Sequence, residues 1–162
     1  MTNKRTNEKI TILGIGNTLF SDEGVGIHLL PMLETALEGY ANVEIIEGLT
    51  DGMRLLEPVE DAENLIIIDA INAGKKGGTI ISLFGDDIPA YFGVKMSIHQ
   101  LGFQEVLLTA KMRERYPKRI AMFGMQPTSL ELGIELTNTN REKLPELADA
   151  VVHQVNEWCK VS

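Results

Sequence analysis

Short runs of apolar residues recur along the chain and predict five β-strands. Three of these runs are apolar almost throughout, which is typical of central strands covered on both faces of a sheet. They lie at 10–16, 64–70 and 119–125. Two shorter runs, at 43–47 and 79–84, complete the set.

Apolar residues spaced three or four positions apart predict four helices, over 23–39, 51–57, 98–114 and 141–160. Asn140 is the candidate N-cap of the last helix. Its apolar stripe consists of Leu144, Leu147, Val151, Val155 and Trp158. Strands that alternate with helices indicate a single α/β domain over 1–162, with helices on both faces of the sheet.

One connection is too short for a parallel pair of strands. Only residues 71–78 separate the third and fourth strands, and they include the sequence GKKGG. A parallel crossover needs about a dozen residues or more, so we expect the fourth strand to be antiparallel in a mixed, mostly parallel sheet. In open sheets of this kind, functional sites form at the carboxyl ends of the parallel strands.

Composition narrows the class of protein. The 162 residues carry a formal net charge of −8, which argues against nucleic acid or an anionic membrane surface as the main partner. The amino-terminal residues are polar, and no apolar run approaches the length of a membrane span. A single cysteine, Cys159, excludes an intrachain disulfide and a cysteine-based zinc site. We expect a cytoplasmic protein.

The sequence GIGNTLFSDEGVG leads from the first strand into a helix and resembles a phosphate-binding turn. The third glycine of a dinucleotide fingerprint would fall at Leu19, and no Walker lysine follows. Asp22 and Glu23 would also repel a phosphate. Both acids are compatible with simple stabilisation of the helix dipole. Gly24 and Gly26 cost helix stability, however, and favour the close approach of another group.

Two more segments carry candidate metal ligands. Asp69 ends the apolar strand LIIIDA, where the loop after the first strand also opens. His99 is in the first turn of a helix predicted from the capping-box spacing of Ser97 and Gln100, where the dipole favours a neutral imidazole. Oxygen and nitrogen donors suit nickel, cobalt or zinc. His28 and His153 are interpreted as structural or exposed.

Four motifs in this order resemble the hydrogenase maturation proteases: GIGNTLFSDEGVG, LIIIDAI, SIHQLG and FGMQPTSLELGIEL, over residues 12 to about 157. The resemblance implies a three-layer α/β sandwich around a mixed five-stranded sheet. It implies an endopeptidase that removes the C-terminal extension of a nickel–iron hydrogenase large-subunit precursor after nickel insertion. Carried over motif by motif, it makes Glu23, Asp69 and His99 the residues that contact the metal, with Asp22 beside them.

The chain departs from the family after the second strand, where many members have Asp-Gly-Gly-Thr. Glu47 stands in place of that Asp, and Leu49 in place of the second glycine. We expect activity to survive this change and the choice of hydrogenase to be affected. Gln126 and the segment 131–133 fall in the family's distal motif, which we interpret as scaffold and substrate groove.

The resulting hypothesis is hydrolysis of one peptide bond by an aspartic-type endopeptidase. Nickel carried by the precursor is held by the three metal contacts, Asp69 serves both binding and catalysis, and Asp22 or Glu47 is the general base. Other divalent cations are expected to take the site in vitro. Catalysis through Cys159 is disfavoured. Three alternatives remain open: a nickel-binding or delivery module, another endopeptidase of the same fold such as a spore germination protease, and a nucleotide-binding domain.

Overall fold

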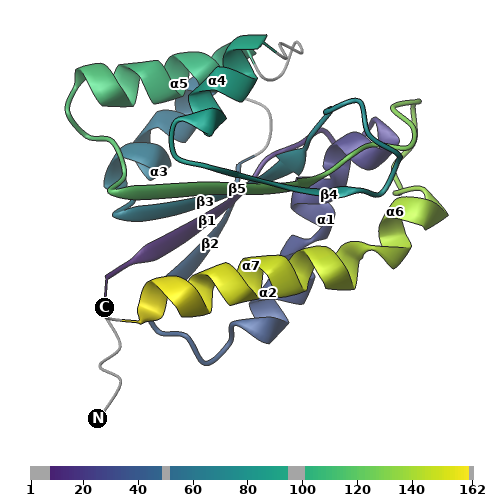
Figure 1. Cartoon of the computed structure of the whole chain (residues 1–162), viewed down its shortest axis with the longest axis horizontal. Helices are drawn as coiled ribbons and strands as arrows, with labels where there is room; N and C mark the ends of the chain where they lie inside the picture. The colour runs from purple at the N-terminus through teal and green to yellow at the C-terminus, as the bar shows by residue number, and fades with distance from the viewer. Residues whose placement is uncertain (1–7, 49–51, 95–100, 161–162) are drawn as a thin grey trace.

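A five-stranded mixed sheet forms the centre of the molecule, as predicted. The computed structural model describes residues 8–48, 52–94 and 101–160. The strands are β1 (Ile10–Gly14), β2 (Val43–Glu47), β3 (Asn64–Ala70), β4 (Ile80–Phe84) and β5 (Arg119–Met125). Their spatial order is β2-β1-β3-β5-β4 (Figure 1). All neighbours are parallel except β4, which pairs antiparallel with β5, as the short 71–78 connection requires.

The strand register sets which residues share the carboxyl edge of the sheet. Gly14 at the end of β1 pairs with Glu47 on one side and with Ile68 on the other. Asp69 follows one position later and pairs with Gly124 of β5. The ends of β1 and β2 are therefore level, β3 runs two residues further to Ala70, and the loops that leave these strands start from the same edge.

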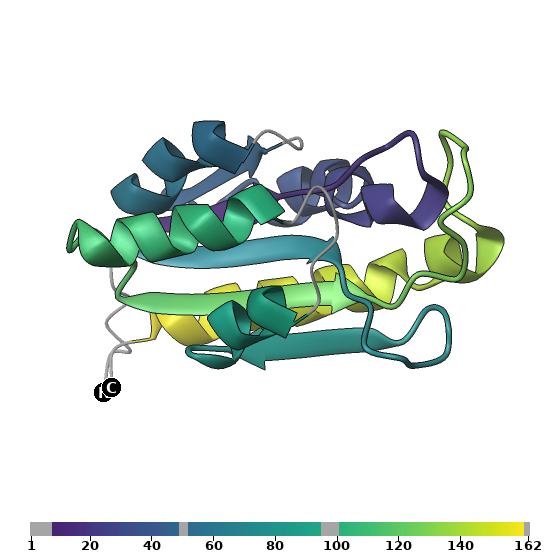
Figure 2. The ribbon, with the colours of Figure 1, turned by 90° about the horizontal axis from the view of Figure 1, so that it is seen from above.

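Helices cover both faces of the sheet and make the three layers that the resemblance implies (Figures 1 and 2). One face packs against α1 (Val25–His28), α2 (Leu30–Ala36) and α7 (Leu144–Cys159). The other face packs against α3 (Leu56–Asp61), α4 (Asp87–Val94) and α5 (Leu101–Met112). Shorter elements complete the chain: the 3₁₀ helices η1 (Ser21–Gly24) and η2 (Gly52–Leu55), and α6 (Asn138–Glu142).

Two prolines divide helices that the periodicity predicts as continuous. The predicted helix 23–39 is broken into η1, α1 and α2, because Pro31 has no N–H to continue the ladder and instead begins α2. Pro145 separates α6 from α7 in the same way. The predicted cap at Asn140 is therefore wrong: Thr137 caps α6, and Asn140 lies buried inside it. The apolar stripe of α7 is confirmed, since all five of its residues are buried.

Helix α4 has no counterpart among the predicted helices. Pro89 and Gly93 interrupt its apolar pattern and are typical of loops. Pro89 falls in the first turn, however, where the missing N–H would have no intrahelical acceptor. Ile88 and Phe92 fix α4 on the sheet by burying their side chains against α5 and β3.

Within the described part of the chain, no helix has the length and apolar character needed to cross a lipid bilayer.

Candidate active site at the carboxyl edge of the sheet

The glycine-rich turn after β1 packs against the strand ends through its backbone. A Cβ atom at Gly26 would stand 2.1 Å from the Ile15 carbonyl oxygen and 2.3 Å from that of Ile68. A Cβ at Gly14 would stand 2.3 Å from the Gly26 carbonyl oxygen. The close approach predicted for Gly26 is therefore present, and the atoms it meets belong to the backbone; a Cβ at Gly24 would instead stand 3.0 Å from Thr18 Cα and 3.2 Å from the His28 side chain. The contact of Gly26 places η1 directly above the ends of β1 and β3.

Of the two acids of η1, Asp22 is buried and Glu23 is partly accessible to water. Removal from water disfavours the ionised form, and this burial raises the pKa of Glu23 from 4.5 to about 7. A carboxylate held at a desolvation cost is the kind of group that a site for a cation contains.

Asp69 is completely buried near the end of β3. Its Oδ1 accepts a hydrogen bond of 2.8 Å from the backbone N–H of Ala70. Ile67 and Ile71 stand two positions before and after Asp69, on the same side of the chain, and belong to the core under α3, α4 and α5. Asp69 therefore points to that face, at the carboxyl edge, as the sequence predicts for its position.

The remaining predicted residues fall into two groups. Glu47 is exposed at the end of β2, level with Gly14 of β1. Because β1 lies between β2 and β3, the strand of Glu47 is about 10 Å from the strand of Asp69. His99, Ser97 and Leu49 lie outside the described residues. Across the described residues there is no group of three or more His, Cys, Asp or Glu side chains placed to hold a metal ion. The three-ligand set that includes His99 stays a prediction.

The Asp22 carboxylate binds the loop 126–137 between β5 and α6, which we call the distal loop. The sequence does not reveal this role. Asp22 is completely buried. Oδ2 accepts hydrogen bonds from the N–H groups of Thr128 (2.9 Å) and Ser129 (3.0 Å). Oδ1 accepts one from the N–H of Thr137 (2.8 Å), and the Thr137 hydroxyl lies 2.9 Å from Oδ2. We call this set of contacts the Asp22 clamp.

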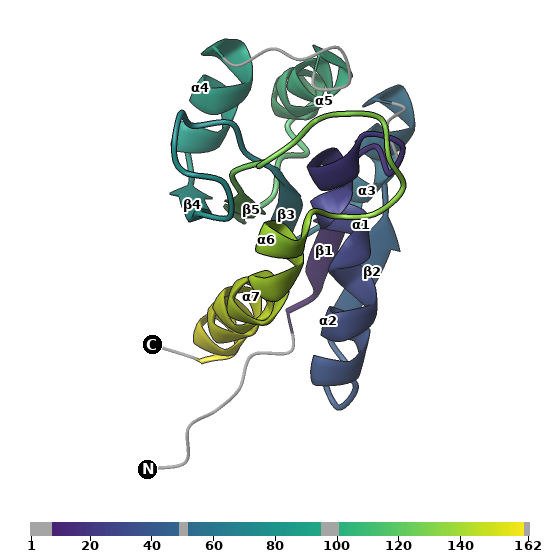
Figure 3. The ribbon, with the colours of Figure 1, turned by 90° about the vertical axis from the view of Figure 1, so that its right-hand side faces the viewer.

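Neighbouring backbone contacts extend the Asp22 clamp along η1 (Figure 3). The N–H of Ser21 donates to the Gly133 carbonyl (2.8 Å), and the Gly133 N–H donates to the Leu19 carbonyl (2.9 Å). The Ser21 hydroxyl donates to the Glu131 carbonyl at 2.7 Å. Ser21 has φ +51°, a left-handed conformation that is strained for a residue with a side chain. The distal loop holds Ser21 in this conformation and so fixes the turn that carries Glu23.

A second buried network supports the other side of the distal loop. Gln126 accepts hydrogen bonds from the N–H groups of Ala73 (2.7 Å) and Lys75 (3.2 Å) through Oε1. Asn140 donates to the Gln126 carbonyl (3.1 Å) and accepts from the Thr128 hydroxyl (2.6 Å). The loops after β1, β3 and β5 are thus joined into one unit at the carboxyl edge.

The raised pKa of Glu23 gives a stability prediction. A folded-state pKa above the unfolded value means that ionisation destabilises the fold, so the free energy of unfolding falls as pH rises from 4.5 to about 7. Glu23→Gln should therefore raise the free energy of unfolding at pH 8 by about 1–2 kcal/mol, a value reduced for partial exposure. At pH 4.5 the variant and wild type should differ little. Urea denaturation at both pH values measures the difference.

Glu34→Gln is the matched control, because Glu34 is exposed on α2. Its effect should be the same at both pH values. An effect of Glu23→Gln that did not change between pH 4.5 and pH 8 would contradict the desolvation of Glu23.

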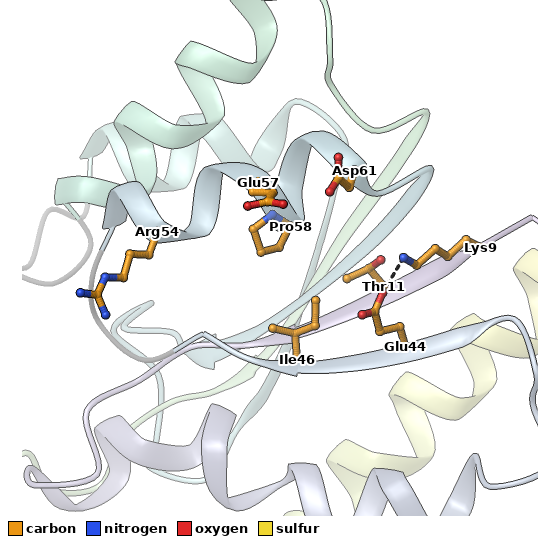
Figure 4. A pocket seen from close by; sticks show the side chains of 8 residues that line it. All are labelled: Lys9, Thr11, Glu44, Ile46, Arg54, Glu57, Pro58 and Asp61. Atoms are coloured by element: carbon orange, nitrogen blue, oxygen red, sulfur yellow. Dashed lines mark ion pairs between the residues drawn. The ribbon is translucent and has the colours of Figure 1, made fainter.

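A cavity of about 290 Å³ lies elsewhere, between α3 and the strands β1 and β2 (Figure 4). Lys9 and Glu44 form an ion pair at its floor, and Asp61 lies at the end of α3, toward the amino edge of the sheet. Its lining contains two basic and three acidic side chains, so it favours neither an anion nor a cation. None of the predicted site residues contributes to it.

Comparison with known proteins supplies the family. The family model for hydrogenase maturation proteases matches residues 27–154. The hydrogenase 2 maturation protease of Escherichia coli is 36% identical over 150 residues, which cover 92% of each chain. The hydrogenase expression/formation protein HupD of Rhodobacter capsulatus is 42% identical over 125 residues. That match covers 76% of this chain, which spans only 60% of the HupD length.

The fold is shared with a solved structure, the hydrogenase maturating endopeptidase HybD from Escherichia coli. The two structures superimpose with a TM-score of 0.84 at 35% sequence identity, over 92% of this chain and 93% of HybD. The chain belongs to the hydrogenase maturation protease family.

Proposed function

We propose that this chain is an endopeptidase that removes the C-terminal extension of a nickel–iron hydrogenase large-subunit precursor after nickel insertion. The observation that carries the proposal is the structural match to HybD, named as a maturating endopeptidase, along 92% of the chain. The relatives named as maturation proteases support the same reaction. A nickel-delivery module and a nucleotide-binding domain gain no such support.

Glu23, Asp69 and His99 are proposed to contact the nickel that the precursor carries. Two carboxylates and an imidazole are donors that a borderline divalent cation accepts. Glu23 fits this role because burial raises the pKa of its carboxyl to about 7, and a neighbouring positive charge would favour the ionised form that burial disfavours. Nickel is thus part of the substrate, and when bound it supplies positive charge beside the scissile peptide bond. Zinc, cobalt or other divalent cations are expected to occupy the same donors in vitro.

Glu47 is the better candidate for the general base. It is exposed, so water reaches its carboxylate, whereas both oxygens of Asp22 are occupied by the Asp22 clamp. In the proposed step the base takes a proton from water while the water oxygen attacks the scissile carbonyl carbon, and the proton then passes to the leaving amine. No protein nucleophile is needed for this aspartic-type hydrolysis. Cys159 is buried in α7 and contacts Asn42, at the opposite edge of the sheet from Asp69.

Processing should depend on nickel in the precursor and not on metal in the enzyme. Without nickel, the partly buried Glu23 and the buried Asp69 would lack the positive charge that is proposed to favour binding of the precursor. The enzyme is treated with a chelator and desalted, then mixed with nickel-loaded or nickel-free precursor. Intact-mass spectrometry should detect shortening of the loaded precursor alone.

The control is untreated enzyme. With each precursor it should give the same result as the chelator-treated enzyme. Efficient cutting of the nickel-free precursor would refute nickel-dependent recognition and leave the endopeptidase assignment standing. A loaded precursor of unchanged mass, under conditions where HybD cuts its own substrate, would refute the endopeptidase assignment.

A further inference from the structure

Five large apolar side chains are exposed on two loops next to η1. They are Leu19, Phe20, Leu130, Leu132 and Ile134, with between 40% and 80% of each residue exposed to water. We call this set the apolar loop surface. The other exposed large apolar side chains of the described residues are scattered over α2, β4 and α5: Met32, Phe84, Leu108 and Met112. A concentration of this kind on one surface is typical of a site for a macromolecular partner.

The two loops of the apolar loop surface are paired, so its side chains form one surface. Phe20 and Gly133 form an isolated parallel β-bridge. The Gly133 N–H donates to Leu19, and the Ser21 N–H donates to Gly133. Leu132 and Ile134 therefore flank the residue that is bonded to the Leu19–Ser21 segment.

The surface is held in a fixed shape before any partner binds. The Asp22 clamp fastens both ends of the distal loop, at Thr128 and at Thr137, to the buried carboxylate. The left-handed φ of Ser21 is maintained by the same contacts. Rigid loops lose little conformational freedom on binding, which strengthens association for a given contact area.

We propose that the apolar loop surface docks the folded body of the hydrogenase precursor and thereby brings the cleavage region to Glu23. This inference rests on the proposed function. Phe20 and Glu23 belong to the same turn, and the Asp22 clamp fixes both, so the surface is continuous with the candidate site.

The shape of the surface favours a folded partner over a short peptide. Leu132 and Ile134 are 80% and 71% exposed, so they stand out from the molecule rather than line a groove. Projecting apolar side chains fit a recess in a folded protein. The distal loop also lies at the end of the molecule where β1, β3 and β5 finish, clear of the helical layers (Figures 1 and 3).

Charge disfavours a second copy of this chain as the occupant. Each copy carries a formal net charge of −8. A two-fold contact would bring the exposed Glu131 and Glu135 of both copies into one interface, where Arg141 balances part of the charge at Glu135 (3.6 Å) and no described cation pairs with Glu131. The precursor is therefore the favoured occupant, and basic groups on its surface would complement the charge of this acidic margin.

The test compares two double variants of the full chain. Leu132→Gln combined with Ile134→Gln should raise the KM for nickel-loaded precursor at least tenfold and leave kcat within twofold. Burial of each apolar side chain on binding contributes about one factor of ten in affinity. Leu108→Gln with Met112→Gln is the matched control, because these residues are 58% and 77% exposed on α5. Its KM should match that of the wild type.

A second measurement separates the body of the precursor from its extension. Processed large subunit, which lacks the extension, should inhibit the wild type competitively and the Leu132/Ile134 variant at least tenfold more weakly. A synthetic peptide of the extension should inhibit both enzymes equally. Equal inhibition of both enzymes by the processed subunit would overturn the proposal.

The remaining outcomes are also decisive. A Leu132/Ile134 variant with wild-type KM would overturn the docking role. Wild-type enzyme that sediments as a dimer, with the variant a monomer, would assign the surface to self-association and overturn it too. Failure of the wild type to cut the precursor would defeat the proposed function alone. In that case calorimetric binding decides: loss of precursor binding only in the Leu132/Ile134 variant supports the surface, and equal or absent binding overturns it.

Discussion

Replacement of Asp22 by alanine is expected to lower the free energy of unfolding by about 4 kcal/mol. The substitution leaves the N–H groups of Thr128, Ser129 and Thr137 without their carboxylate acceptor. Each unsatisfied buried donor costs about 1–3 kcal/mol, and entry of water into the gap offsets part of the sum. Because domains of this size are stable by about 5–15 kcal/mol, the variant should be close to the limit of folding. Urea denaturation followed by circular dichroism measures the change.

Asp149→Ala is the matched control, since Asp149 is an exposed acid on α7, and its effect should stay below about 0.5 kcal/mol. If Asp22→Ala does not fold, Asp22→Asn is used to test the Asp22 clamp instead. Its amide group presents hydrogens to two N–H donors, and amide hydrogen exchange should then accelerate at residues 128–137 before the rest of the sheet. A loss below 1 kcal/mol for Asp22→Ala would show that the Asp22 clamp does not stabilise the site.

Asp69→Asn should separate function from folding more cleanly than any other substitution. Asparagine has nearly the same volume, and its Oδ1 retains the 2.8 Å hydrogen bond from Ala70. The fold should therefore keep its stability to within about 1 kcal/mol. Loss of the negative charge removes the electrostatic contribution proposed for Asp69, and the processing rate should fall about 10²- to 10³-fold. Initial rates of precursor shortening by intact-mass spectrometry measure this change.

Asp61→Asn controls for the loss of one acid, because Asp61 is an exposed carboxylate at the end of α3, before β3 begins. Its rate should equal that of the wild type. A folded Asp69→Asn enzyme that processes precursor at the wild-type rate would refute a role for this carboxylate in binding or catalysis.

The sheet could be predicted from the local pattern because a strand covered on both faces consists of consecutive apolar residues. The apolar runs of β3 and β5 gave the bounds of those strands, and the length of the 71–78 connection gave the direction of β4. Helix boundaries were less predictable. The apolar spacing of α1 and α2 is continuous, and only the missing N–H of Pro31 divides them. Asparagine is a residue type that N-caps favour, but Asn140 lies inside α6, where it forms hydrogen bonds with Gln126 and Thr128.

The site could be predicted in part. Strand position was enough to place Asp69 at the carboxyl edge, whereas the role of Glu23 rests on motif resemblance and stays a prediction. The partners of Asp22 could not be predicted, because Thr128 and Thr137 lie 106 and 115 residues away and no local pattern marks them. The apolar loop surface was equally hidden, because Leu132 and Ile134 alternate with Glu and Gly, and the segment was interpreted as scaffold and substrate groove.

The long sequence separation within the Asp22 clamp has a consequence during synthesis of the protein. Translation proceeds at about 5–20 residues per second, so Thr137 leaves the ribosome roughly 6–23 seconds after Asp22. During that interval β1, β2 and β3 can associate, but the turn that carries Glu23 lacks the loop that fixes Ser21. Entropy of loop closure also delays contacts of such long range relative to local ones. The turn that carries Glu23 is therefore unorganised in a nascent chain, and the selectivity proposed for a nickel-loaded precursor arises only once the last third of the sequence has been made.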